Sequence, residues 1–204
     1  MSIAIVDYGM ANLRSVQKAF EHVGHGAEII SRPEQIDHAD KLVLPGVGAF
    51  ADAVATLRDQ DLAGPILRHI AKGKLFFGIC LGLQMLFDVG YEDGEHQGLG
   101  VFKGKCVRFD VDETQGLKVP HMGWNQLQIR RPAPIFRDLP EDCGVYFVHG
   151  YHVVPTDAGI VATTTDYGGD FVSGVWRENV FATQFHPEKS QKIGLQILAN
   201  FASL

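Results

Sequence analysis

The stretch that decides the fold is Gly78-Ile79-Cys80-Leu81-Gly82. Residues 74–79 form a short apolar run typical of a strand, and residues 81–89 are predicted to begin a helix. The cysteine between them has a glycine two places before it and another two places after it. This G-x-C-x-G pattern is the sulfur version of a nucleophile elbow, in which a strand turns sharply into a helix and exposes the reactive atom. Glycines suit such a turn because backbone packs against backbone where a Cβ would not fit.

The predicted position of Cys80 favours thiol chemistry. At a helix N-terminus the positive end of the helix dipole favours a thiolate. The N–H of Leu81, the next residue, would point to where an oxyanion forms. A small buried cysteine with a structural role is the alternative, since most free cysteines are buried. The catalytic interpretation therefore requires a nearby base.

The sequence before the elbow alternates apolar runs with helical periodicity. Strands are predicted at residues 3–6, 27–30 and 42–44, and helices at 13–23, 49–58 and 63–71. This rhythm predicts a parallel sheet with helices on both faces. Ligands bind such sheets at the carboxyl ends of the strands. We therefore expect a site where Cys80 ends its strand.

The second half of the chain changes character. From residue 101 to about residue 185 the runs are short, rich in β-branched and aromatic residues, and separated by turn signals. They predict antiparallel hairpins added to the sheet, and the chain then ends in an amphipathic helix. No linker or repeat interrupts it. We expect one α/β domain over residues 1–204, with a mostly parallel sheet and antiparallel strands in its second half.

A candidate base follows the last predicted strand, residues 181–185. His186 and Glu188 are separated by Pro187. In extended backbone, residues two apart point the same way, so the imidazole and the carboxylate are predicted to lie side by side, with Pro187 keeping the segment extended. The imidazole would take the cysteine proton and later protonate a leaving amine, while the carboxylate orients it. Together with the elbow, this pair predicts a Cys80–His186–Glu188 triad.

Composition excludes several classes of function. The net charge is −6 and no long basic cluster occurs, which argues against nucleic-acid binding. No segment approaches the length of a membrane span, and the N-terminus lacks the pattern of a signal peptide. The three cysteines are widely spaced, which fits a reducing compartment better than a disulfide framework. We expect a cytoplasmic protein.

No metal or cofactor site is predicted. His149 and His152 are three residues apart, but no third ligand is spaced to join them. The loop at residues 45–48, P-G-V-G, lacks the lysine and Ser/Thr of a phosphate-binding loop.

Several stretches resemble the class I glutamine amidotransferases. They are G-I-C-L-G-L-Q at 78–84, P-G-V-G at 45–48 and F-H-P-E at 185–188. Three more resemble the glutaminase subunits of imidazole glycerol phosphate synthases: D-Y-G-M-A-N-L at 7–13, P-H-M-G-W-N at 120–125 and H-P-E-K-S at 186–190. The match runs in order along essentially the whole chain. Ala11 and Gly150 depart from it, because the family usually has glycine at the first position and serine or threonine at the second.

The resemblance implies a flavodoxin-like amidotransferase fold and a defined chemistry. Cys80 would attack the side-chain amide of glutamine to give a thioester, and His186 would protonate the departing ammonia. The oxyanion would be held by the N–H of Leu81 and a second N–H from Val47 or Gly48, after a flip of their loop. The residues implied to bind glutamine are Gly46, Gln84, Gly150 and Tyr151.

A partner is implied as well, a cyclase with a (β/α)₈ barrel, in a heterodimer. It would use the ammonia to make imidazole glycerol phosphate and aminoimidazole carboxamide ribonucleotide in histidine biosynthesis. The implied interface residues are Asn12, Met122, Trp124 and Lys189. Trp124 has the character of an interface anchor, although burial in the core is the alternative for it and for Met122.

Two other functions fit the triad. One is another stand-alone glutaminase, such as the subunit of pyridoxal phosphate synthase, against which the Met-Gly-Trp-Asn stretch counts. The other is a binding module that regulates a partner without turnover, against which the complete triad counts.

Overall fold

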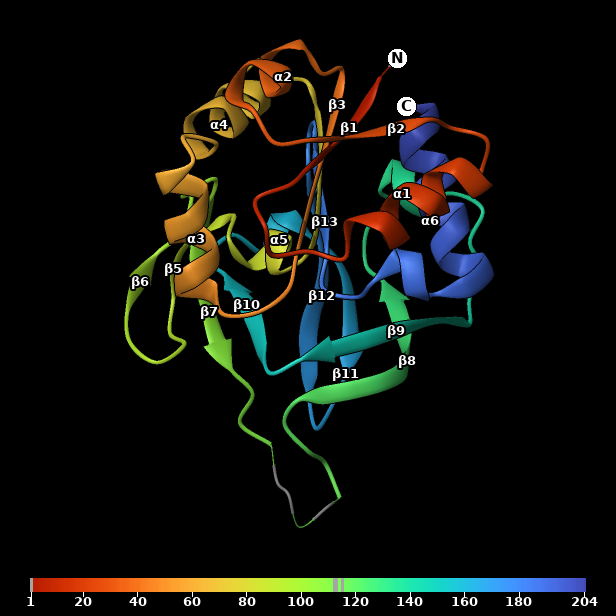
Figure 1. Cartoon of the computed structure of the whole chain (residues 1–204). Helices are drawn as coiled ribbons and strands as arrows, with labels where there is room; N and C mark the ends of the chain where they lie inside the picture. Colours follow the sequence, from red (N-terminus) through yellow and green to blue (C-terminus); the bar gives the residue numbers. More distant parts are fainter. Residues whose placement is uncertain (1, 112–113, 115) are drawn as a thin grey trace.

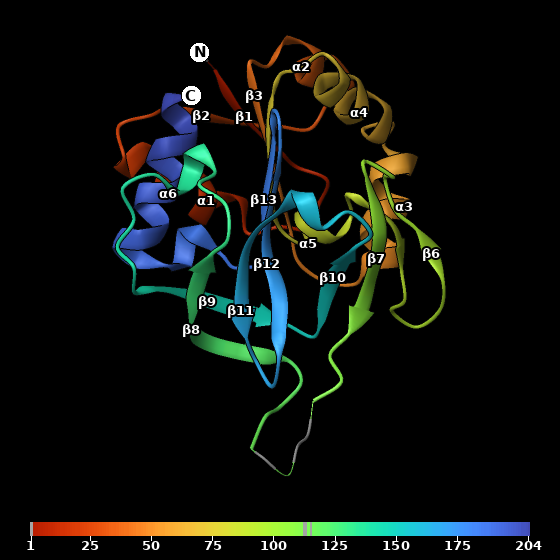
Figure 2. The same cartoon turned by 180° about the vertical axis from the view of Figure 1, so that it is seen from behind.

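The computed structural model describes residues 2–111, 114 and 116–204. Figure 1 shows helices on both sides of a central sheet. A group of strands lies in the lower part of this view: β8 (His121–Ile129), β9 (Cys143–His149), β11 (Val161–Asp166) and β12 (Asp170–Arg177). The view from behind in Figure 2 shows the same layers. Among the helices in these residues, none is long and apolar enough to cross a membrane.

The parallel half of the sheet has the strand order β2-β1-β3-β4-β13. Its strands are β1 (Ile3–Val6), β2 (Ala27–Ile30), β3 (Lys41–Gly46), β4 (Leu75–Cys80) and β13 (Val180–Thr183). The predicted parallel strands are confirmed. Because Gly46 pairs with Cys80 and Thr183 pairs with Ile79, β3, β4 and β13 end at the same edge.

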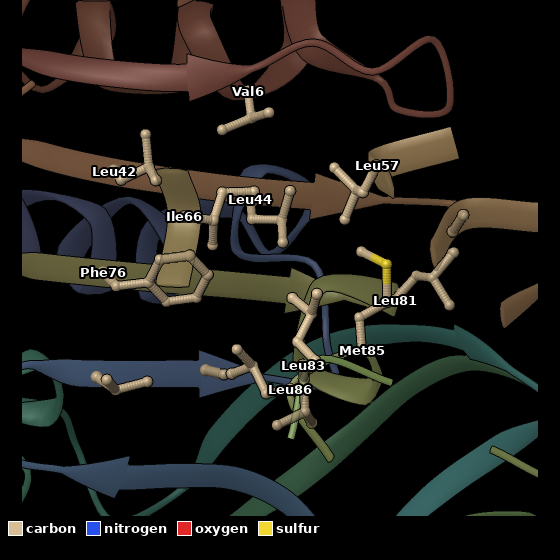
Figure 3. Packing of buried hydrophobic residues seen from close by; sticks show 14 of the residues in the cluster. Val6, Leu42, Leu44, Leu57, Ile66, Phe76, Leu81, Leu83, Met85 and Leu86 are labelled. Carbon is tan, nitrogen blue, oxygen red and sulfur yellow. The ribbon is translucent and has the colours of Figure 1, made fainter. Parts of the chain in front are cut away.

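Helices cover both faces of this half (Figure 1). The helices α1 (Leu13–His22) and α6 (Gln191–Ser203) lie on one face, and α2 (Pro33–His38), α3 (Phe50–Asp59) and α4 (Ala63–Ala71) lie on the other. Two apolar cores result. Figure 3 shows Leu44 of β3 and Phe76 of β4 among Leu57 of α3, Ile66 of α4 and Leu81 at the elbow.

The second half of the sheet continues from β13. Its pairings are mostly antiparallel, which confirms the antiparallel strands predicted for the second half of the chain. β12 (Asp170–Arg177) pairs with β13, and β10 (Tyr151–Pro155) pairs with β12 and with β7 (Phe102–Arg108). β5 (Phe87–Gly90) is an exception, since it pairs in parallel with β7 and antiparallel only with β6 (His96–Gln97). The other antiparallel strands are β8 (His121–Ile129), β9 (Cys143–His149) and β11 (Val161–Asp166). Three 3₁₀ turns complete the described elements: η2 (Pro134–Phe136), η3 (Ala158–Ile160) and η4 (Pro187–Lys189).

The helix after the elbow is shorter than predicted. α5 covers only Leu81–Gln84, and β5 begins at Phe87, so the expected helix at 81–89 is wrong in its second half. The side chains from Leu83 to Phe87 are almost all fully buried, which hides any one-sided helical pattern. Pairing of Phe87 with Phe102 of β7 decides the conformation there.

Candidate active site

The elbow has the strained geometry that its sequence predicts. Cys80 has φ +56° and ψ −107°, a region that costs free energy for a residue with a side chain. A Cβ on Gly82 would collide with the carbonyl oxygen of Leu44, and a Cβ on Gly78 would lie 2.8 Å from the carbonyl oxygen of Gly82. The two glycines are therefore required because the α5 backbone packs directly on β3 and β4.

His186 and Glu188 meet as predicted, but by a different backbone route. Nδ1 of His186 lies 2.8 Å from Oε1 of Glu188, and both side chains are almost fully buried. The expectation that Pro187 keeps the segment extended is wrong, because η4 begins at Pro187. His186 itself is extended, with φ −98° and ψ 99°, so its ring turns back over the 3₁₀ turn toward Glu188.

The backbone of His186 is clamped on two sides. Its N–H donates to the carbonyl oxygen of Tyr146 in β9 at 3.0 Å, and its carbonyl oxygen accepts from the hydroxyl of Ser190 at 2.6 Å. The same hydroxyl accepts from the N–H of Tyr146 at 3.0 Å. Ser190, which is fully buried, thus ties the histidine to β9.

The electrostatics around His186 favour a charged imidazole. Burial alone would lower the pKa of His186, but the nearby Cys80 and Glu188 outweigh it and raise this pKa to about 10. Nε2 of the ring is buried and makes no hydrogen bond of normal geometry to any described residue. Since Nδ1 is engaged by Glu188, Nε2 is the ring nitrogen left for exchange with Cys80, which lines the same cavity.

A chain of glutamines, which sequence reasoning missed in part, supports the sulfur. Nε2 of Gln184 lies 3.7 Å from Sγ of Cys80, and Gln184 is fully buried. Nε2 of Gln84 donates to Oε1 of Gln184 at 3.2 Å and to the carbonyl oxygen of Tyr151 at 3.0 Å. Gln184 stands two residues before His186, and the two-residue periodicity of extended chain would have placed both at one site.

A cavity of about 240 Å³ opens at Cys80. It is smaller than the ~300–1,000 Å³ typical of pockets for drug-sized ligands, so it fits a smaller molecule. Its lining consists of Val47, Gly48, Cys80, Leu81, Gln84, Glu92, Val148, His149, Gly150, Tyr151 and His186.

The lining includes most of the predicted residues and adds others. Of the residues expected to contact glutamine, Gly46 is not in the lining, since it lies buried behind the loop against Tyr8 and Leu81. Glu92 is a lining residue that sequence reasoning missed. Its Oε2 accepts a hydrogen bond from the N–H of Phe50 at the start of α3, 2.7 Å away. No local sequence signal marks Glu92, because the fold of the 91–95 turn brings it there.

Of the two N–H groups predicted to hold the oxyanion, the one from the 45–48 loop is already engaged in a hydrogen bond. Leu81 is the first residue of α5, directly after Cys80. The N–H of Val47 instead donates to the carbonyl oxygen of Met10 at 2.9 Å. Gly48, with φ +94°, follows in a left-handed conformation. The loop must therefore change conformation before Val47 can donate to an oxyanion.

Two neutral histidines lie at the cavity, His149 in its lining and His121 in contact with His149. Nδ1 of His149 donates to the carbonyl oxygen of Tyr151 at 2.8 Å, which leaves Nε2 to accept from Nδ1 of His121 at 3.3 Å. Burial lowers the pKa of His149 to about 3 and that of His121 to about 4. Within the described residues, no group of three or more His, Cys, Asp and Glu side chains could hold a metal ion.

The residues expected at an interface lie near the same edge. Met122 and Trp124 are 63% and 51% exposed, so burial in the core is excluded for both. Trp124 pairs across β8 and β9 with Tyr146, the residue that clamps His186. Asn12 follows β1 and Lys189 follows β13, both at the carboxyl ends of parallel strands.

The chain is similar to known proteins in sequence and in fold. The family described as "Glutamine amidotransferase class-I" matches residues 4–203. The chain is 58% identical to "Imidazole glycerol phosphate synthase subunit HisH" of Syntrophotalea carbinolica, over 99% of this chain and 100% of that protein. It is 49% identical to the protein of the same name from Geobacter sulfurreducens, over 99% and 98% of the two chains. The fold is similar to a chain in the structure of PurLQS from Thermotoga maritima, with TM-score 0.77, 21% identity and coverage of 99% and 97%.

Proposed function

Because this chain belongs to the class-I glutamine amidotransferase family, we propose that it hydrolyses glutamine and delivers the ammonia to an imidazole glycerol phosphate synthase. Relatives that share about half of its residues over their full length carry the name of that synthase's subunit, which supports histidine biosynthesis over the pyridoxal phosphate alternative. The observation that carries the chemistry is the juxtaposition of Cys80, on its strained elbow, with a buried His186 held by Glu188.

The reaction follows from the positions of these groups. The Cys80 sulfur attacks the side-chain carbonyl carbon of glutamine and forms a C–S bond, with negative charge developing on the oxygen. The N–H of Leu81 donates to this oxygen. The imidazolium of His186 carries the proton that came from the Cys80 thiol. It gives this proton to the amide nitrogen as the C–N bond breaks, and the nitrogen leaves as ammonia. His186 next takes a proton from water, which attacks the thioester and releases glutamate and Cys80.

The cavity supports recognition of a free amino acid. Glu92 supplies a negative charge for an α-ammonium group, and the 149–151 segment supplies backbone groups. The amide nitrogen of Gln84 already donates to Tyr151 and Gln184, so we assign Gln84 to shaping the cavity as much as to contacting glutamine.

We further propose that one domain, residues 1–204, binds a (β/α)₈-barrel cyclase as a heterodimer through Asn12, Met122, Trp124 and Lys189. The exposure of Met122 and Trp124 beside the active-site edge supports this surface. Met1, Asp112, Glu113 and Gln115 of this domain lie outside the described residues. A reducing, cytoplasmic location is supported by three cysteines that are all free and buried.

The test is glutamate release from glutamine by the purified chain, alone and then with the cyclase barrel and its ribonucleotide ligand. We expect slow release alone and strong stimulation in the full mixture. Cys80→Ser should abolish both, while Cys143→Ser, which changes a buried thiol remote in sequence from the elbow, should keep them. Turnover that survives Cys80→Ser would contradict the assignment, and activity indifferent to this partner would indicate a different synthase.

A further inference from the structure

The hydroxyl of Tyr8 is buried without a hydrogen-bond partner among the described residues. Tyr8 follows β1 and is 1% exposed, so bulk water does not solvate it. A buried polar group without a partner costs free energy in the resting protein. A tyrosine kept at such a position, where phenylalanine would fill the same space, needs another explanation.

The Tyr8 hydroxyl lies against the loop that carries the second oxyanion donor. A Cβ on Gly46 would overlap the hydroxyl oxygen and would lie 2.9 Å from Cβ of Leu81. The hydroxyl is therefore wedged between the start of the 46–48 loop and the elbow. Glycine at position 46 is what allows this close approach.

The same loop is held in its resting state by the hydrogen bond from the N–H of Val47 to the carbonyl oxygen of Met10. This N–H and the carbonyl of Gly46 belong to one planar peptide unit, so a turn of that unit moves both groups to opposite sides. When Val47 leaves Met10 to face the oxyanion, the loop loses a hydrogen bond, and the Gly46 carbonyl turns away from its former side. The turned state needs a new donor to hold it.

We propose that Tyr8 is a positioning residue of the glutaminase, whose hydroxyl donates to the carbonyl oxygen of Gly46 when the 46–47 peptide has turned, and so stabilises the loop with Val47 facing the oxyanion. This inference rests on the proposed function. The carbonyl carbon of Gly46 is bonded to the α-carbon that the hydroxyl already approaches, so rotation about ψ of Gly46 brings the oxygen within reach.

The hydroxyl remains a donor under all working conditions. Burial, with the charge of the nearby Cys80, raises the pKa of Tyr8 well above its usual range. Tyr8 therefore stays protonated at neutral pH, and its hydroxyl can donate a hydrogen bond.

The test compares Tyr8→Phe with the parent chain in the full complex with the cyclase barrel and its ribonucleotide ligand. We expect stimulated kcat to fall about tenfold, the value of one hydrogen bond, with KM for glutamine unchanged. The unstimulated rate should fall as well, because it also depends on the turned loop. The thermal unfolding midpoint should not fall, because the resting protein makes no bond with this hydroxyl. The matched control is Tyr167→Phe, which removes a hydroxyl that accepts from the N–H and donates to the carbonyl of Lys118. That change should lower stability and leave stimulation intact.

Three other outcomes would overturn the inference in distinguishable ways. Equal stimulated kcat of Tyr8→Phe and the parent would leave the proposed function standing and remove the role of Tyr8. A lower unfolding midpoint of Tyr8→Phe alongside the loss of rate would show a structural role instead. No stimulation of the parent chain by this partner would contradict the proposed function and the inference with it.

Discussion

The backbone N–H of Val47 donates to the carbonyl oxygen of Met10 at 2.9 Å. This bond joins the loop after β3 to the segment after β1 and occupies the N–H that we propose as the second oxyanion donor. The resting chain is therefore expected to be a slow glutaminase. A partner that favours the turned loop raises kcat by shifting the population between the two loop states.

Gly48→Ala tests the freedom of this loop. Gly48 has φ +94°, and a Cβ there would lie 3.0 Å from Cε of Met10. Alanine should lower the free energy of unfolding by about 1 kcal/mol and reduce stimulated kcat by about tenfold or more. The measurements are glutamate release in the complex and denaturant unfolding of the chain. Gly26→Ala is the control, since a Cβ there meets nothing within 4 Å. If the Gly48→Ala enzyme were stimulated as strongly as the parent, this result would argue against loop movement.

Glu92→Gln tests recognition of the substrate's ammonium group. Glutamine at this position can still accept from the N–H of Phe50 but carries no charge. KM for glutamine should rise about 10- to 100-fold, the worth of a charged hydrogen bond, while kcat changes little. A glutamine analogue without the α-amino group should be a poor substrate of the parent enzyme. The parent and the Glu92→Gln variant should turn it over at the same rate. If the variant and the parent had the same KM for glutamine, Glu92 would not be a substrate-binding residue.

His121 and His149 predict a loss of stability in acid. Their folded pKa values, about 4 and about 3, lie below the usual histidine value, so the unfolded chain binds protons that the folded chain does not. The free energy of unfolding is at its full value above pH ~6.5. It falls on acidification toward pH 4, by about 1.4 kcal/mol per pH unit for each histidine. Urea unfolding across this range measures the slope. His121→Gln should reduce the change in unfolding free energy per pH unit. His22→Gln, the control at an exposed position, should leave it unchanged. The same slope for His121→Gln and the parent chain would contradict the assignment.

Trp124→Ala tests the proposed interface. Its side chain is 51% exposed on β8, so truncation should scarcely change stability. Affinity for the cyclase barrel should fall about 30-fold, equal to ~2 kcal/mol at an interface hot spot, and stimulation at limiting partner should fall with it. Titration calorimetry gives the affinity. Ile129→Ala, at the end of the same strand and 39% exposed, is the control. Unchanged affinity of the Trp124 variant would place the partner elsewhere.

Much of the site was predictable because its chemistry is local. The spacing around Cys80 predicts the strained turn, and Gly78 and Gly82 stand where a Cβ would collide. His186 and Glu188 were predictable as a pair because they are two residues apart, although the backbone between them forms a 3₁₀ turn. Gln184 escaped notice because glutamine in a buried segment carries no distinctive chemical signal until its partners are known.

The short helix after the elbow shows where local reasoning fails. The residues from Leu83 to Phe87, apolar except for Gln84, suit a helix or a strand equally well. Pairing with β7, a strand formed later in the chain, decides between them.

By itself, the sequence determined the alternation that gives a parallel sheet, the turn that presents Cys80, and the His186–Glu188 pair that we propose as its base, since each depends on residues within one or two turns of backbone. The tertiary structure decided what long-range packing controls: β13 beside β4, Glu92 in the cavity, Val47 tied to Met10, and the Tyr8 hydroxyl wedged against Gly46. These contacts join segments from 37 to more than 100 residues apart or cross between separate strands, so no local periodicity encodes them. They form because the carboxyl ends of parallel strands meet at one edge, where each side chain's environment is set by the neighbouring strands.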